Sequence, residues 1–293
     1  STQYTTLKLA TENMVSTAEL AGQRVQWELE SFIVSTEEVG CNAELANANT
    51  SDKRKKEIID MKVLQYGMDR GCVINKDGLG SNGIDYSDRE YFKNAMNGKT
   101  TVTEPMIDRA TGKMAVIVAA PLWDNGVAGK KAVGCVYFVP HEEFLNDIVR
   151  DLKVSENSTA YVLGRSGIII ADSDSEVVTS QQSYITLAEE DSGYGQLAEV
   201  NRKMIAGEDG SDTIKVKGKS TLIGYAPIEG TDGWSIAVSA PSMDYLESSV
   251  TFIFITIAIA LICAIICSVN SAKTGSSIGD PVAPVSYTHL RAH

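Results

Sequence analysis

The chain has 293 residues, of which 43% are hydrophobic and 22% charged, a composition typical of a globular protein that can bury a core. Its formal net charge is −12, from 38 acidic and 26 basic residues. A nucleic-acid-binding protein needs a basic face to replace the counterions around phosphates, so this charge argues against nucleic acid as a partner.

The first predicted element is a long amphipathic helix that runs from about Thr11 to Leu45. This stretch contains no proline, and only Gly22 and Gly40 interrupt it. Apolar residues recur in it at steps of three and four, at Val15, Ala18, Val25, Leu29, Phe32 and Val39. We assign residues 1–48 to this helix and expect its apolar stripe to pack on the chain's own domains or on a partner helix.

Beyond Ile58, short β-branched runs alternate with turn residues, and their order occurs twice. The first copy contains GCVINKDGLGSN from residue 71, KMAVIVAAPL from 113 and AVGCVYFVP from 132. The second contains AYVLGRSGIIIADSD from residue 160, KSTLIGYAPI from 219 and GWSIAVSAP from 233. We predict two tandem antiparallel α+β modules, at residues 49–155 and 156–244, joined by a helix from His141 to Lys153.

A transmembrane helix is predicted within residues 245–269, because the twenty residues from Val250 to Val269 carry no charge. At about 1.5 Å per residue they span about 30 Å, the thickness of a bilayer core. A buried core helix is the alternative. Acidic residues precede the segment and Lys273 follows it, which places residues 1–249 outside the cell membrane. We expect the helix to start near Pro241, and the natural chain to begin earlier with an export signal.

These elements together resemble a double Cache sensor region, with a long helix, two PAS-like modules and an exit helix over roughly residues 1–245. The most specific stretch is residues 85–122, DYSDREYFKNAMNGKTTVTEPMIDRATGKMAVIVAAPL. Residues 277–282, SIGDPV, are similar to the opening of a HAMP linker in methyl-accepting chemotaxis proteins, so we assign 270–285 to such a linker. The last residues, 286–293, look like an artefactual tail whose two histidines are not metal ligands.

Catalysis would require a nucleophile, a base or a metal cluster, and no such set is visible. We interpret residues 164–167, GRSG, as a hairpin turn rather than a nucleophile elbow. Asp172, Asp174 and Glu176 alternate as calcium ligands can, but a solvated loop is the interpretation we favour. We expect no enzyme activity, no cofactor and no metal.

The cysteines outside the apolar segment are odd in number, at Cys41, Cys72 and Cys135. We interpret all three as small core residues. A bridge between Cys72 and Cys135 stays open, because the sequence does not give the distance between them.

Ligand binding is predicted around Arg89. A guanidinium offers a planar fork of donors that grips a carboxylate at two points, and Tyr91 and Phe92 can wall the apolar side of a small pocket. The alternative is a surface ion pair at Arg89, with Tyr91 and Phe92 in the core.

The resemblance adds residues to this site. In amino-acid-binding members of the family, an arginine and a tryptophan hold the ligand carboxylate, and a tyrosine and two aspartates complete the pocket and hold the amine. Arg89 and Asp108 match that pattern, while Tyr91 stands in place of the tryptophan, Met106 of the tyrosine and Tyr137 of one aspartate. The resemblance therefore implies an amino acid, another carboxylate or a small polar metabolite as the ligand.

The predicted function is that of the ligand sensor of a transmembrane chemoreceptor, a homodimer that passes a helix shift to cytoplasmic signalling proteins. The same sensor in a histidine kinase or diguanylate cyclase is the alternative. A membrane-tethered hydrolase or an adhesive ectodomain is a further alternative. The HAMP-like motif counts against both of these, and the missing catalytic set counts against the hydrolase.

Overall fold

The computed structural model describes residues 2–141, 144–245 and 257–268. The chain divides into two compact units, Ser1–Ser242 and Met243–His293. The first unit contains both predicted sheets. The boundaries predicted at 48/49 and 155/156 lie inside this unit and stay predictions.

Three helices open the first unit: α1 (Thr2–Gly40), α2 (Ala43–Ala46) and α3 (Asp52–Tyr66). The long helix is confirmed, although its last predicted turn forms a separate helix. Asn42 explains this break, because its side-chain oxygen accepts hydrogen bonds from the backbone N–H groups of Glu44 and Leu45 and so begins α2.

The first sheet has the strand order β1-β6-β5-β2, and every pair in it is antiparallel. Its strands are β1 (Arg70–Asn75), β2 (Thr101–Val102), β5 (Val118–Trp123) and β6 (Ala132–Val139). Helix α4 (Glu90–Met96), the 3-10 turn η1 (Asp124–Gly126) and a small ladder of β3 (Met106–Ile107) with β4 (Met114–Ala115) accompany it. The run predicted from residue 113 as one strand is therefore split between β4 and β5.

The second sheet has the order β8-β7-β11-β10-β9 and is also antiparallel. Its strands are β7 (Thr159–Leu163), β8 (Ile169–Asp172), β9 (Gly210–Val216), β10 (Lys219–Pro227) and β11 (Ser235–Pro241). The helices around it are α5 (Phe144–Arg150), α6 (Ser175–Thr179), α7 (Tyr184–Glu190), η2 (Ser192–Tyr194) and α8 (Gly195–Ile205). The predicted hairpin turn at residues 164–167 is confirmed, since it joins β7 to β8.

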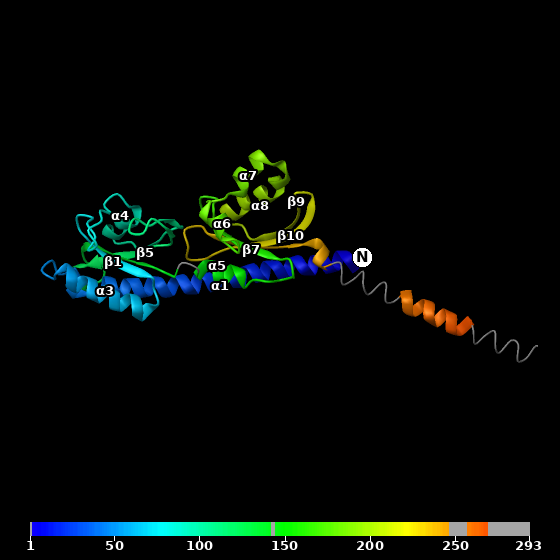
Figure 1. Ribbon diagram of the computed structural model, residues 1–293, viewed down its shortest axis with the longest axis horizontal. Helices are drawn as coiled ribbons and strands as arrows, with labels where there is room; N and C mark the ends of the chain where they lie inside the picture. The colour runs from blue at the N-terminus through cyan, green and yellow to red at the C-terminus, as the bar shows by residue number, and fades with distance from the viewer. Residues whose placement is uncertain (1, 142–143, 246–256, 269–293) are drawn as a thin grey trace, which may run out of the picture. The chain divides into compact units, whose positions relative to one another are not determined.

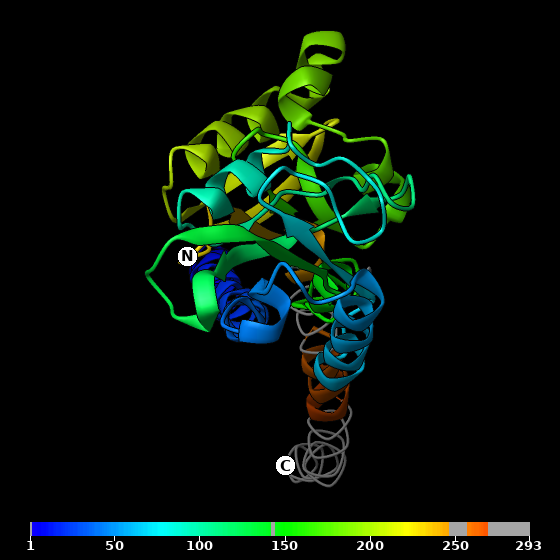
Figure 2. The same ribbon diagram turned by 90° about the vertical axis from the view of Figure 1, so that its left-hand side faces the viewer.

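Helix α1 runs beneath both sheets (Figures 1 and 2). Of the predicted stripe, Ala18, Val25, Leu29 and Val39 are buried and Val15 and Phe32 are half-buried, and Met14 and Ala21 are buried beside them. Gly224 of β10 shows how closely the helix and the second sheet approach, because a Cβ there would lie 2.6 Å from the backbone of Met14 and Val15. The α+β fold with two antiparallel sheets on one helix is thus as predicted.

The face of each sheet that points away from α1, called here its outer face, is covered by different elements. Helix α4 and the loop before it cover the first sheet, and α6, α7 and α8 cover the second (Figure 1). Each outer face has its own apolar cluster, which includes Tyr137 in the first sheet and Tyr161 in the second. Alternate side chains of a strand point to opposite faces, so each sheet is buried on both sides.

Within the described residues, no helix is both long enough and apolar enough to cross a membrane. Residues 257–268 of the predicted span are helical, and their large apolar side chains are exposed. Pro241 ends β11, and residues 242–245 begin a helical turn. The predicted continuity up to Val269, the linker at 270–285 and the tail at 286–293 fall wholly or partly outside the described residues.

Candidate ligand-binding site

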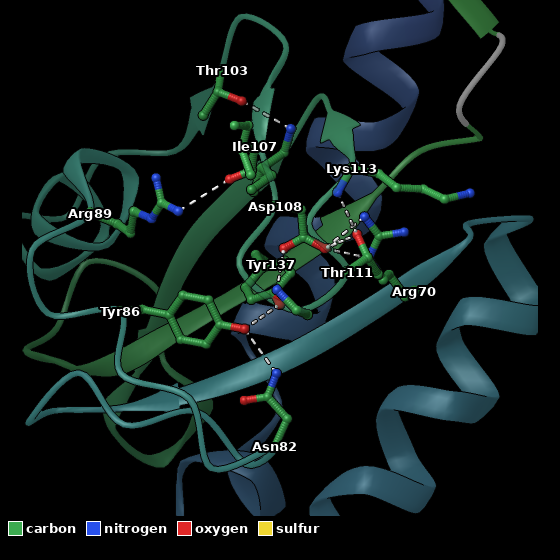
Figure 3. Close-up of polar contacts among 12 residues, drawn as sticks. Arg70, Asn82, Tyr86, Arg89, Thr103, Ile107, Asp108, Thr111, Lys113 and Tyr137 are labelled. Atoms are coloured by element: carbon green, nitrogen blue, oxygen red, sulfur yellow. Dashed lines mark hydrogen bonds and ion pairs between the residues drawn. The ribbon is translucent and has the colours of Figure 1, made fainter.

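Arg89 is the residue before α4, where its extended backbone (φ −69°, ψ 134°) starts the helix. Its side chain is half-buried, and its Nη2 donates a hydrogen bond to the carbonyl oxygen of Ile107 at 3.1 Å (Figure 3). Its Nε is buried and has no hydrogen-bond partner among the described residues. A buried N–H donor without a partner is uncommon and marks a position where a ligand can bind.

Asp108 follows β3 and is fully buried. Its Oδ2 accepts hydrogen bonds from Arg70 Nε at 2.8 Å and from Thr111 Oγ1 at 3.1 Å, and it lies 2.7 Å from Arg70 Nη2. Its Oδ1 accepts from the backbone N–H of Ala110 at 3.2 Å. A buried carboxylate requires such compensation, so the negative charge of Asp108 is already matched by Arg70.

The predicted site residues Asp108 and Arg89 therefore lie in one region. Arg70, which the sequence did not point to, lies there with them. Arg70 is the first residue of β1, and the sheet brings it to Asp108 across 38 positions of sequence. Figure 3 shows Arg89 on one side of Asp108 and Arg70 on the other. Two of these three residues are basic and one is acidic.

Tyr137 comes from β6 and lies in the same region. Its hydroxyl shares a hydrogen bond of 3.0 Å with the hydroxyl of Tyr86, which accepts another from Asn82 Nδ2 at 2.8 Å (Figure 3). Burial raises the pKa of Tyr137, so its phenol stays protonated. Tyr86 and Asn82 were also missed, because a turn loop before α4 gives little indication of where its side chains point.

Tyr91 and Phe92 are on the buried side of α4, with only 2% and 6% of their surface exposed. The rings of Tyr91 and Tyr137 are 6.0 Å apart in an edge-to-face arrangement, and half-buried Met106 packs against the same cluster. The structure thus brings all six predicted residues to one outer face. Tyr91, Phe92 and Tyr137 all belong to the buried cluster there, as the alternative interpretation expected for Tyr91 and Phe92.

An open groove of about 940 Å³ runs beside this cluster. Tyr91 and Met106 line it on the side of the first sheet, and Arg165, Ser166 and Trp234 line it on the side of the second. Of the six predicted residues, Tyr91 and Met106 face the groove. A ligand that reaches Arg89 from this groove would meet the ring of Tyr91 and the side chain of Met106.

Arg109 holds the loop that carries Arg89. It donates to both carboxylate oxygens of Asp88, at 2.8 and 2.9 Å, and to the carbonyl oxygen of Asp85. The hydrogen bond from this guanidinium lowers the pKa of Asp88 to about 2. The turn between β3 and β4 and the loop before α4 are thereby tied together next to Arg89.

The cysteines are free thiols. Cys72 and Cys135 are buried, and burial raises the pKa of both thiols, so they remain protonated and unreactive. Cys41 was predicted as core and is exposed, because it lies just past the end of α1. No group of three or more His, Cys, Asp and Glu residues in the described ranges could hold a metal ion.

The family model dCache_1, described as a Cache domain, matches residues 4–249. The chain belongs to the Cache domain family. This match covers α1, both sheets and the candidate site at Arg89, so the predicted resemblance is confirmed. A search of curated proteins finds no significant match.

Solved structures with the same fold are ligand-binding domains of chemoreceptors. That of Pseudomonas fluorescens CtaA with L-serine is 19% identical, covers 79% of this chain and 96% of its own, and has a TM-score of 0.61. That of the Pseudomonas aeruginosa PAO1 amino acid chemoreceptor PctC with GABA is 20% identical, with coverages of 78% and 98% and a TM-score of 0.59. The sensory domain of Campylobacter jejuni Tlp3 with isoleucine is 11% identical, with coverages of 83% and 97% and a TM-score of 0.62. At these identities the likeness establishes the Cache fold.

Proposed function

We propose that this Cache domain is the extracytoplasmic sensor of a transmembrane chemoreceptor and that it binds a small carboxylate-bearing ligand at Arg89. The observation that carries the proposal is the buried Nε of Arg89, which has no partner among the described residues. A guanidinium whose Nε–H is free and whose Nη2 is held by Ile107 is preorganised to grip a carboxylate.

The charge balance favours a ligand with a negative group. Arg70 already compensates Asp108, which leaves the charge of Arg89 unmatched within the cluster. The compounds in the structures of CtaA, PctC and Tlp3 all carry a carboxylate, with an amine besides. In this chain Asp108 is less available to an amine, so the carboxylate is the group recognised first, whether the ligand is an amino acid or a simple acid.

A contact between the two sheets offers a route for the signal. Glu104, in the segment between β2 and β3, accepts hydrogen bonds from the backbone N–H of Ser166 at 3.3 Å and from its hydroxyl at 2.7 Å. Ser166 is in the β7–β8 turn of the second sheet. A ligand that moves Met106 would therefore act on the second sheet through Glu104, and β11 leads from that sheet toward residue 245.

We further propose that residues 245–269 anchor the sensor in the cell membrane, with residues 1–249 outside. The exposed apolar side chains of residues 257–268 suit a lipid environment, because they have no protein core to enter. Methyl-accepting chemotaxis signalling is the proposed output. A histidine kinase or a diguanylate cyclase beyond residue 285 is the alternative, and the sequence that follows the HAMP-like motif would decide between them.

A homodimer through α1 fits the exposed side of this helix. Leu20, Trp27 and Val34 are 66%, 66% and 59% exposed and recur every seven residues. A seven-residue apolar repeat is the pattern by which two helices pack along their length. We propose a second copy of α1 as the partner of this stripe.

Thermal-shift measurements with a panel of small carboxylates and their neutral amides test the ligand class. A carboxylate should stabilise the chain where its amide does not, by mass action on the folded state. Arg89→Ala should lower the affinity of a hit at least about 30-fold, or about 2 kcal/mol, because it removes a desolvated charge partner. Arg202→Ala, which removes an exposed arginine paired with Glu199, is the matched control. Equal affinities in Arg89→Ala and the parent chain would contradict the proposal.

A further inference from the structure

A second cavity, of about 450 Å³, lies on the outer face of the second sheet. Its floor includes Ile223 and the paired hydroxyls of Thr159 and Ser239, whose oxygens are 3.0 Å apart. Its walls include residues of β8, α6, α7 and η2. The volume lies within the range of small-molecule sites, which is about 300 to 1,000 Å³.

The lining of this cavity carries negative charge without a positive partner. Asp172 and Asp174 line it, whereas none of the described lining residues is a lysine, arginine or histidine. Asp172 makes no ion pair with any residue that the structure describes. Its Oδ1 accepts a hydrogen bond from the backbone N–H of Asp174 at 2.9 Å, and burial raises the pKa of its carboxyl. Asp174 is exposed and caps the start of α6.

Three tyrosines stand next to Asp172 in the same cavity. The rings of Tyr161 and Tyr184 are 5.5 Å apart edge to face, and those of Tyr184 and Tyr194 are stacked at 5.8 Å. The electron-rich faces of such rings attract cations, and Lys217 shows this directly, because its Nζ lies 4.8 Å from the centre of the Tyr194 ring. An aromatic wall beside an unpaired carboxylate is the combination that recognises an organic cation.

We propose that this cavity is a second ligand site, which binds a small organic ammonium ion through Asp172 and the wall of Tyr161, Tyr184 and Tyr194. The ammonium group supplies the positive charge that the lining residues lack, and the rings cover the apolar part of the ligand. A carboxylate ligand is disfavoured, because it would face Asp172 and Asp174 without a cation between them. This site is separate from Arg89, which precedes α4 on the outer face of the first sheet.

The experiment is calorimetric titration of the 293-residue chain, in a non-ionic detergent, with two pairs of probes of matched shape. Choline is compared with 3,3-dimethylbutan-1-ol, and propylamine with propan-1-ol, so that charge is the main difference within each pair. At least one cation should bind about tenfold or more tightly than its neutral partner, or about 1.4 kcal/mol. If neither cation binds better than its neutral partner, the proposal is overturned.

The variant Asp172→Asn locates the binding. It keeps an oxygen for the N–H of Asp174 and removes only the charge, and it should weaken cation binding at least about tenfold. Asp60→Asn, which removes an exposed carboxylate of α3, should leave the affinity unchanged. Arg89→Ala should also leave it unchanged, which separates this site from the carboxylate site. Unaltered cation affinity in Asp172→Asn would overturn the assignment.

A second variant, Tyr184→Leu, tests the site separately in case Asp172→Asn does not fold. Tyr184 is half-buried at the start of α7, and Tyr184→Leu keeps an apolar side chain while it removes the ring. It should weaken choline binding more than the binding of 3,3-dimethylbutan-1-ol, because only the cation loses an electrostatic attraction. An equal loss for both probes would show that the tyrosine wall does not select for charge.

Discussion

Both sheets are antiparallel and rest on α1, yet their outer faces place charged groups differently. On the first, the buried Asp108 is paired with Arg70, and Tyr137 is buried in the apolar cluster. On the second, Asp172 has no positive partner among the described residues and a cavity remains open beside it. The same scaffold therefore offers two sites of opposite chemical preference.

The strand register shows how few positions make this difference. In the first sheet Cys72 pairs with Tyr137, and in the second Tyr161 pairs with Ala237. Two residues earlier on the same strands, the first sheet places Arg70 and the second places Thr159. At this position the first sheet carries Arg70, the cation that compensates Asp108. The second sheet carries Thr159, whose hydroxyl forms part of the cavity floor. A repeated fold fixes where these side chains lie, and single substitutions decide which ligand they suit.

The largest effect on stability is expected at Arg70, which neutralises the buried carboxylate of Asp108 in the first site. Arg70→Met should lower the free energy of unfolding by about 3 kcal/mol, because it removes the positive charge that compensates the buried carboxylate of Asp108. Among the described residues, that carboxylate then keeps only the hydrogen bonds from Thr111 and Ala110. Urea unfolding measures this change. Lys203→Met is the matched control in the second sheet, where the pair with Asp212 is about one-third exposed and should contribute less than about 1 kcal/mol. Equal losses in both variants would show that Arg70 and Asp108 are an ordinary surface pair.

Local sequence patterns were sufficient to predict the helices and strands. They were insufficient to predict which side chains pair with each other. The apolar periodicity of α1 and the alternating strands depend on neighbouring residues, so both could be predicted. The pairing of Arg70 with Asp108 depends on β1 lying beside β6, which no local pattern contains.

The six site residues came mainly from the family resemblance, and the structure gathers them while it divides their roles between core and polar contact. The second cavity was missed for a physical reason. Asp172 was interpreted as part of a solvated loop, whereas it ends β8 and is half-buried. Only the placement of Tyr184 and Tyr194, on elements distant in sequence, turns its surroundings into a cavity.

A smaller effect is expected on the thermal stability of the ligand-free chain when Asp172 of the second site is replaced. Burial, and then repulsion from Asp174, raise the pKa of Asp172, with Tyr161 and Tyr184 as its other titratable neighbours. A raised carboxyl pKa lowers stability as the pH rises from the ordinary aspartate range through the raised value. Asp172→Asn should therefore raise the thermal midpoint at neutral pH, by the few degrees that about 1 kcal/mol produces in a domain of this size, and should leave it unchanged at acidic pH. A lower midpoint at neutral pH would indicate that Asp172 has a structural partner.

The smallest expected effect is at Asp88, and its sign is opposite. The hydrogen bond from Arg109 lowers the pKa of Asp88 to about 2, so the folded state binds its proton less tightly than the unfolded chain does. This stabilisation is present above the ordinary aspartate range and is lost as the pH falls toward 2. Asp88→Asn should accordingly lower the thermal midpoint slightly at neutral pH, and the difference from the parent chain should close on acidification. Because the pair is exposed, salt should reduce the effect. Thermal scans of Asp88→Asn and Asp172→Asn across the same pH series would then diverge from the parent in opposite directions as the pH rises, and parallel curves would contradict the assigned charge balance of the two sites.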